Sequence, residues 1–160
     1  MDRFAANSVA AKQSIIAIAR DIMTSTAFEN TSSTAIAAWK PYALTALRVM
    51  TGLLFFEHGT SKLLGFPFDQ KLANLQLFSL MGLAGALELV GGFLIIIGLF
   101  TRPVAFVLSG QMAVAYFMSH GARNFFPTLN GGDAAILFCF VFLYLVAAGA
   151  GPFSLDARRR

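Results

Sequence analysis

Glu88 is a lone charge in a long apolar stretch. It is the only charged side chain between Leu72 and Thr101, within LFSLMGLAGALELVGGFLIIIGLF. About 20 apolar residues are enough for a helix to cross a bilayer. A carboxylate inside such a span is costly unless it is protonated or paired, and it usually marks a functional site. Glu88 is therefore the first candidate for a residue that does chemistry.

Arg48 is the preferred partner for Glu88. At about 1.5 Å per helical residue, Arg48 lies about 10 Å and Glu88 about 18 Å from the same membrane face, within reach of a long side chain. The sequence thus predicts a buried Arg48–Glu88 pair. Such a pair either takes part in ligand binding or only sets how the helices align, which is the best-attested use of buried ion pairs.

Two histidines, His58 and His120, end two of the expected spans on the same side of the membrane. A neutral imidazole can donate a hydrogen bond to a carbonyl oxygen or take a proton from a hydroxyl near neutral pH, which suits the head of a quinone. Either histidine alone is also explained by an interfacial position and a hydrogen bond to a loop. The candidate residues for a ligand site or buried polar core are Arg48, His58, Lys62, Glu88, His120 and Asp133.

No dedicated metal or cofactor motif accompanies these residues. A metal set would have to combine the two histidines with Glu57, Glu88 or Asp133, without any Glu-x-x-His repeat. The lone Cys139 excludes an internal disulfide and a thiol relay. The sequence therefore predicts no metal site and no intrinsic cofactor, leaves a quinone as the candidate ligand, and assigns no catalytic residue.

These side chains need a membrane fold to hold them. Hydrophobic residues make up 57% of the 160 residues, which is too many for a soluble domain of this size. Short connections favour an all-α, up-down four-helix transmembrane bundle. A tight turn at 101–103 is expected between the second and third spans. The four expected spans are 41–64, 75–100, a third from this turn to about residue 120, and 134–150.

Residues 1–40 differ from the rest and contain no apolar run long enough to span. Apolar residues at helical spacing indicate either an amphipathic helix on the membrane surface or a mobile tail, and TSSTA at 31–35 is typical of a linker. The predicted organisation is an N-terminal segment at 1–40, a four-helix domain at 41–156 and a basic tail at 157–160.

Basic residues are distributed unevenly between the two expected membrane faces. An excess of Lys and Arg marks cytoplasmic segments, so both termini are predicted to be cytoplasmic in the inner membrane of a bacterium. The three terminal arginines follow an apolar segment, and lipid headgroups rather than nucleic acid are their expected partner. The face with the termini holds Arg3, Lys12, Arg20, Lys40, Arg102 and Arg158 to Arg160, and the other face Lys62, Lys71 and Arg123.

Several segments together resemble the DoxX family of small four-span membrane proteins. They are LRVMTGLLFFEHGTSKL at 47–63, GALELVGGFLIIIGLFTRPVA at 85–105, AYFMSHGARNFFP at 115–127 and NGGDAAILFCFVFLYLVAAGAGPFSLD at 130–156. The family usually has glutamate where this chain has Asp133, which shortens the reach of that carboxylate. The residues that match the family pattern are Arg48, His58, Gly59, Lys62, Glu88, Gly92, Arg102, Asn130, Gly151, Pro152, Ser154 and Asp156.

The resemblance implies a membrane component linked to oxidoreductases, with quinone-dependent subunits among its relatives. The leading hypothesis is a subunit of a redox system that binds a quinone or similar lipid-soluble ligand in an outward-facing polar pocket. Electrons would then come from a partner oxidoreductase or membrane subunit, and homo-oligomerisation stays open. The rival is a non-catalytic scaffold or assembly factor with a structural polar core. A proton-coupled transporter using Glu88 ranks last, because no internal repeat is present.

Overall fold

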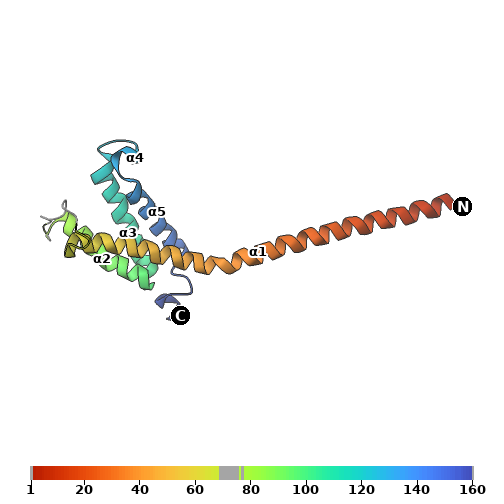
Figure 1. Ribbon diagram of the computed structural model, residues 1–160, viewed down its shortest axis with the longest axis horizontal. Coiled ribbons are helices and arrows are strands. Elements are labelled where there is room, and N and C mark those ends of the chain that lie inside the picture. The colour runs from red at the N-terminus through yellow and green to blue at the C-terminus, as the bar shows by residue number, and fades with distance from the viewer. Residues whose placement is uncertain (1, 69–75, 77, 160) are drawn as a thin grey trace. The chain divides into compact units, whose positions relative to one another are not determined.

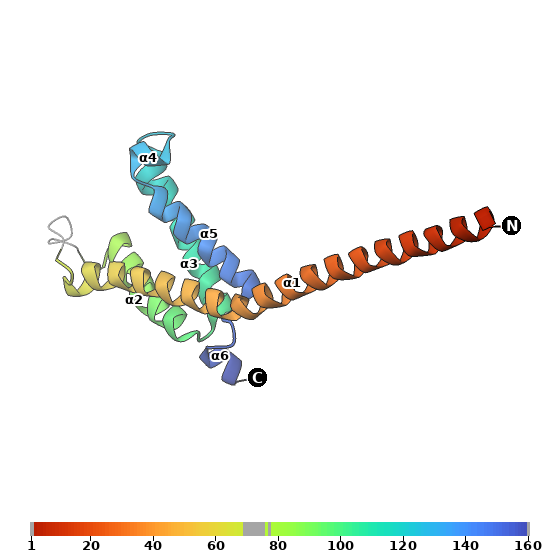
Figure 2. The ribbon, with the colours of Figure 1, turned by 45° about the vertical axis from the view of Figure 1, so that its right-hand side comes forward.

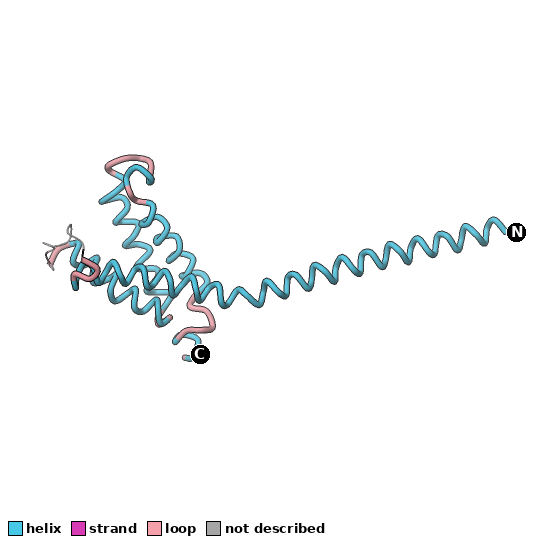
Figure 3. Tube along the Cα trace, viewed as in Figure 1, coloured by secondary structure: helices cyan, strands magenta, loops and turns pink. Residues whose placement is uncertain are grey.

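The computed structural model describes residues 2–68, 76 and 78–159, and for most of residues 2–36 it describes the backbone alone. Every regular element in this described part is helical (Figure 3), so the predicted all-α class is confirmed there. The contacts within the chain divide it into two units, residues 1–40 and 41–160.

The first helix, α1, is continuous from Asp2 to Leu64 and includes Pro41. The linker predicted at 31–35 is wrong, since these residues lie inside the helix. Pro41 was expected to begin a helix, whereas the chain is already helical before it. Proline removes one backbone donor from a helix, and here the Pro41 carbonyl accepts a hydrogen bond from Thr45 Oγ1 at 2.7 Å. Whether the segment at 1–40 is amphipathic stays a prediction.

Four longer helices make up most of the described part of the second unit. They are α1 from Pro41 onward, α2 (Leu80–Ile97), α3 (Thr101–Ala115) and α5 (Asp133–Ala148). Within this unit α1 lies antiparallel to α2, and α3 lies antiparallel to α5 (Figures 1 and 2). The α1–α2 pair lies at an angle to the α3–α5 pair. The two pairs are close together near the C-terminal segment and are farthest apart at their other ends. The shorter helices are η2 (Tyr116–Gly121), α4 (Pro127–Asn130) and α6 (Leu155–Arg158).

One helix of the described chain, α2, is long and apolar enough to cross a membrane, with 18 residues and a mean hydropathy of 2.2. Helix α5 is also apolar but has 16 residues. Large apolar side chains on three helices face outward: Phe93 on α2, Phe106 on α3 and Phe140 on α5 are each more than half exposed. Such an apolar exterior is typical of a surface that contacts lipid or another protein. The four-span arrangement itself stays a prediction.

The connection between α2 and α3 lies earlier than expected. Helix α2 ends at Gly98, whose φ of 67° is the left-handed conformation that commonly closes a helix. The next helix begins at Thr101, directly after Phe100. The turn is therefore at 98–100, and the prediction of a turn at 101–103 is wrong, because those three residues form the first turn of α3.

Glycines bring α1 and α2 into direct backbone contact. A Cβ atom on Gly59 would lie 2.4 Å from the backbone nitrogen of Leu89, and one on Gly92 would lie 2.7 Å from that of Phe56. No side chain fits into these spaces, so the two helices are in van der Waals contact through their backbones. This contact sets which residue of α1 lies opposite Glu88.

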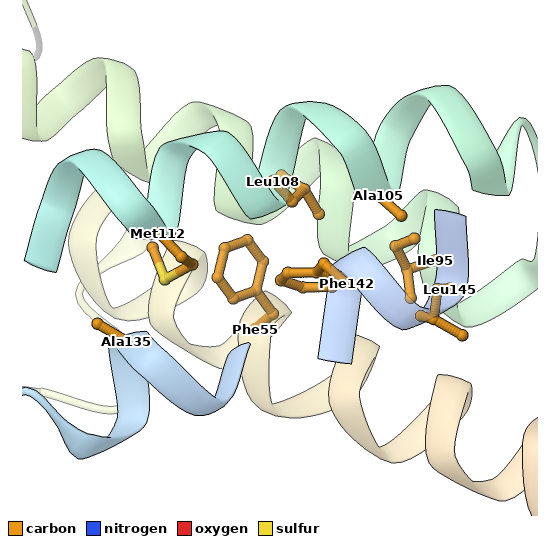
Figure 4. Close-up of a cluster of buried hydrophobic side chains, with 8 residues drawn as sticks. All are labelled: Phe55, Ile95, Ala105, Leu108, Met112, Ala135, Phe142 and Leu145. Carbon is orange, nitrogen blue, oxygen red and sulfur yellow. The ribbon is translucent and has the colours of Figure 1, made fainter. Parts of the chain in front are cut away.

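The apolar core forms between all four longer helices (Figure 4). The rings of Phe55 on α1 and Phe142 on α5 meet edge to face, with centroids 4.8 Å apart. On α1, Phe55 is seven residues from both Arg48 and Lys62, about two helical turns in each direction. The core therefore separates a polar cluster around Arg48 from another around Glu88. The core residues are Phe55, Ile95, Ala105, Leu108, Met112, Ala135, Phe142 and Leu145.

Candidate functional site

Glu88 forms a buried ion pair with Lys62. The residue lies on α2 and is 2% exposed as a whole, and Lys62 Nζ of α1 donates to its Oε1 at 2.5 Å. The absence of a side chain on Gly85 leaves room for the Lys62 stem, because a Cβ there would lie 3.1 Å from Lys62 Cβ. The predicted Arg48–Glu88 pair is therefore wrong. The close backbone contact at Gly59 places Lys62, not Arg48, beside the carboxylate.

Gln111 of α3 is a third member of this cluster, and the sequence reasoning missed it. Its Nε2 donates to the carbonyl of Ala84 at 3.2 Å and lies 3.4 Å from Glu88 Oε1. The signal was available, since Gln111 is the only amide side chain between Pro103 and His120. Two oxygens of the cluster, Glu88 Oε2 and Gln111 Oε1, are buried and accept no hydrogen bond from the described part of the chain.

His58 borders the same cluster from α1. It lies one helical turn before Lys62 on the same helix. The ring meets Phe138 of α5 edge to face, with centroids 6.0 Å apart. His58, Lys62, Glu88 and Gln111 are called the Glu88 cluster below. It draws on three helices and borders the fourth.

His120 and Asp133 lie in other surroundings. His120 Nδ1 is 3.0 Å from the backbone oxygen of Asn130, whose own side chain binds the carbonyl of Asn124 and the amide of Gly132. His120 therefore contacts a loop through a hydrogen bond. This was the alternative to ligand binding in the sequence analysis. Asp133 is exposed in the first turn of α5, where the helix dipole favours an acid. None of the described contacts of either residue reaches the Glu88 cluster.

Arg48 is a structural anchor at the other end of the core. Its guanidinium is 1% exposed and donates four hydrogen bonds, all to backbone carbonyls. Nη1 binds the oxygens of Ile95 and Ile96 at 2.6 and 2.5 Å, and both carbonyls belong to the last turn of α2, where few backbone donors remain. The oxygen of Ile95 also accepts a hydrogen bond from the Gly98 amide at 3.1 Å. Nε binds Ala150 at 3.0 Å and Nη2 binds Phe153 at 2.7 Å. One side chain thus ties the end of α2 to the segment after α5.

Asp156 caps α3 from the same C-terminal segment. Its Oδ1 and Oδ2 accept hydrogen bonds from the backbone amides of Phe100 and Thr101, both at 2.8 Å. Partial desolvation acts to raise the pKa of this carboxyl. The bonds from Thr101 and Phe100, together with the charge of Arg159, outweigh that effect and hold the pKa of Asp156 below its ordinary value.

The Asp156 cap is expected to make the fold less stable in acid. A group whose pKa is lowered in the folded state stabilises the fold above its unfolded pKa, about 3.8, and loses that contribution as pH falls through the folded value. Asp156→Ala is expected to cost about 1 kcal/mol at neutral pH. Melting temperatures of both proteins between about pH 6 and about pH 3 should converge as the pH falls. A constant difference would contradict the charged cap.

Two cavities lie beside Arg48 and Asp156, of about 500 and 440 Å³. The larger is lined by the start of α3 and the segment between α5 and α6, including Arg102 and Asp156. The smaller is lined by Arg48, Arg158 and their neighbours. Both are therefore at the end of the helices opposite to the Glu88 cluster. The outward-facing polar pocket expected from the sequence stays a prediction.

Comparisons with known proteins place the chain in a family. The DoxX family model matches residues 43–121. An uncharacterized protein of Haemophilus influenzae is 46% identical over 122 residues, which cover 74% of this chain and 91% of that protein. A Bacillus subtilis protein described as "Putative oxidoreductase CatD" is 39% identical over 117 residues, covering 69% of this chain and 81% of that protein. No solved structure matches.

The residues of both polar clusters lie largely within the matched region. Arg48, His58, Lys62, Glu88 and Gln111 all fall between residues 43 and 121. The Haemophilus influenzae relative is matched over nearly its whole length. The chain belongs to the DoxX family.

Proposed function

We propose that this protein is a multi-pass inner-membrane component of a redox system that binds a quinone-type ligand at the Glu88 cluster. The observation that carries the proposal is the Lys62–Glu88 pair, a half-buried ammonium and a buried carboxylate within helices whose outer surface is apolar. Ionisable residues in such a setting commonly mark a ligand or proton pathway. The likeness to the protein described as "Putative oxidoreductase CatD" supports a redox setting.

The cluster contains the groups that a quinone head requires. The ammonium of Lys62, 16% exposed, can donate to a quinone carbonyl oxygen. The exposed ring of His58 adds a second donor beside it. The carboxyl group of Glu88 can pass a proton to or from the ligand oxygen. Two electrons and two protons convert the quinone to the quinol, and the electrons come from a partner oxidoreductase.

The charge distribution supports cytoplasmic termini. Arg102, Arg158 and Arg159 lie together at the end that holds Asp156, whereas the described basic residues near the opposite end are Lys62 and Arg123. Lys71, which was counted with that opposite end, lies outside the described residues. Under the positive-inside rule the arginine-rich end is cytoplasmic and the Glu88 cluster lies toward the outer face.

Glu88→Gln is expected to remove the ligand without unfolding the protein. The substitution keeps the shape of the side chain but abolishes its charge, and the Lys62 ammonium can turn outward because it is already partly exposed. Mass spectrometry of small molecules extracted from gently purified protein should show a quinone in the unaltered protein and at least about tenfold less in the variant.

Asp133→Asn is the matched control, because it makes the same carboxylate-to-amide change at an exposed position outside the cluster. It should retain the ligand. A quinone held equally by all three proteins would refute the assignment to the Glu88 cluster. Unaltered protein that neither retains a quinone nor binds an added analogue would refute the proposed function.

A scaffold or assembly role is the second candidate, and the N-terminal unit favours it. Residues 1–40 form a unit of their own by contacts, and they are helical from Asp2 onward. We take this helical unit as the segment that docks a partner. Co-purification of a stable partner that is lost when residues 1–38 are deleted, from protein that carries no ligand, would support this role over ligand binding.

A further inference from the structure

Two hydrogen-bond acceptors are left unsatisfied at the centre of the Glu88 cluster. Glu88 Oε2 and Gln111 Oε1 are buried and accept no hydrogen bond from the described residues. Their sister atoms are occupied: Glu88 Oε1 binds Lys62, and Gln111 Nε2 binds the carbonyl of Ala84. Buried polar atoms are almost always paired, so two unpaired acceptors in one cluster mark a position for a donor that the described residues do not supply.

The identity of the orphan atoms determines what can satisfy them. In its ion pair with Lys62, Glu88 is a carboxylate, and a carboxylate only accepts hydrogen bonds. Turning the Gln111 amide over would place its oxygen against the carbonyl of Ala84 and against Glu88 Oε1, which are both acceptors. Both open positions therefore require a donor, and the carbonyl oxygen of a quinone is not one.

We infer that the Glu88 cluster binds the reduced, hydroxyl-bearing form of its ligand, a quinol, in preference to the quinone. This inference rests on the proposed function and names the redox form that the site selects. A hydroxyl oxygen accepts from the Lys62 ammonium while its proton is donated to Glu88 Oε2 or Gln111 Oε1. A carbonyl oxygen makes only the first of these contacts and leaves both acceptors unpaired.

The side chain of Lys62 is the flexible part of the Glu88 cluster. Lys62 is 16% exposed whereas Glu88 is 3% exposed at its side chain, so the ligand approaches past the lysine. Its four-carbon stem allows the ammonium to move outward and remain bonded to the incoming hydroxyl. The hydroxyl then reaches the carboxylate without separating α1 from α2, whose backbones are in contact at Gly59.

The test compares the affinities of duroquinol and duroquinone, measured anaerobically on the full-length protein in detergent, with duroquinol dimethyl ether as an analogue that lacks the hydroxyl donors. The quinol is expected to bind at least about tenfold more tightly than the quinone or the ether. Tenfold selectivity raises the midpoint potential of the bound couple by about 30 mV. Potentiometric titration of the bound couple provides an independent measurement of the same ratio.

Substitution of Gln111 by methionine tests whether the acceptors of the Glu88 cluster cause the preference for quinol over quinone. Gln111→Met removes one of the two acceptors, so the quinol-to-quinone affinity ratio should fall at least about threefold. Ser109→Ala is the control on the same helix, because the Ser109 hydroxyl binds the carbonyl of Cys139 rather than the cluster, and it should keep the ratio. A ratio that Gln111→Met leaves unchanged would overturn the assignment to these acceptors.

The outcomes for the unaltered protein separate the two proposals. Equal affinities, or tighter binding of the quinone, would overturn the inference and leave the proposed function standing. Failure to bind any of the three probes would overturn both. The preference for quinol is measured on the unaltered protein. The inference can therefore be refuted even if the Gln111→Met variant fails to fold.

Discussion

Arg48→Met is expected to lower the free energy of unfolding by about 3–5 kcal/mol. Three of its four acceptors would be left without a described donor, and only the oxygen of Ile95 would keep one, the Gly98 amide. An unpaired buried acceptor costs about 1–3 kcal/mol, and relaxation recovers part of that cost. The guanidinium holds four backbone carbonyls, two at the end of α2 and two in the segment after α5. Reversible unfolding in mixed micelles, followed by circular dichroism, measures the loss. Arg48→Lys should recover little of it, since an ammonium cannot reproduce the planar fork of donors.

Arg102→Met is the control for this prediction. Arg102 is exposed and donates one hydrogen bond, from Nη1 to the carbonyl of Val146 at 3.0 Å. Its loss should cost less than about 1 kcal/mol. Arg48→Met protein that is as stable as the Arg102→Met protein would contradict the structural role of Arg48. It would also reopen a direct role for this guanidinium in ligand binding.

Gly59→Ala is expected to destabilise the protein by about 3 kcal/mol, at the upper end of what overpacking a tight contact usually costs. The added Cβ would lie 2.4 Å from the backbone nitrogen and 2.7 Å from the Cα atom of Leu89. Backbone atoms cannot turn aside as a side chain can, so α1 and α2 must separate. The separation also moves Lys62 away from Glu88, and ligand retention should fall together with stability.

Gly110→Ala is a matched control for the glycine prediction. Gly110 lies within α3, and a Cβ there would meet nothing within 4 Å. Alanine should therefore stabilise α3 by about 0.5–1 kcal/mol, the usual difference between the two residues in a helix. Both variants are compared by thermal unfolding in the same detergent. Similar effects of the two substitutions would contradict the close contact between α1 and α2.

Substitutions of Arg48 and of Glu88 should have different main effects, the first on stability and the second on ligand binding. Arg48 binds only backbone oxygens, so its loss should affect stability first and ligand binding only through the fold. Glu88 has one oxygen in an ion pair and one that accepts no hydrogen bond from the described residues, so its conversion to glutamine should affect ligand binding first. This separation follows from the different kinds of atom that each side chain contacts.

Local patterns in the sequence were enough to predict much of the fold. The apolar runs predicted helices, and the described chain is helical wherever it is regular. Element ends were less accurate, because they depend on caps formed by distant residues. Asp156 caps the start of α3 at Thr101 across 55 residues of chain, and spacing alone cannot show such a bond. The expected linker at 31–35 failed since Ser and Thr also occur inside helices.

The sequence by itself determined that this is an all-helical, largely apolar protein in which Glu88 and Arg48 are buried charges that need partners. Only the tertiary structure decided which partners they have. Depth along a helix allowed Arg48 to approach Glu88, but the rotation of each helix about its axis depends on the glycine contacts between α1 and α2. Those contacts place Lys62 and Gln111 around Glu88. They also direct Arg48 to the carbonyls at the end of α2. Such contacts join residues far apart in the chain, and no local pattern encodes them.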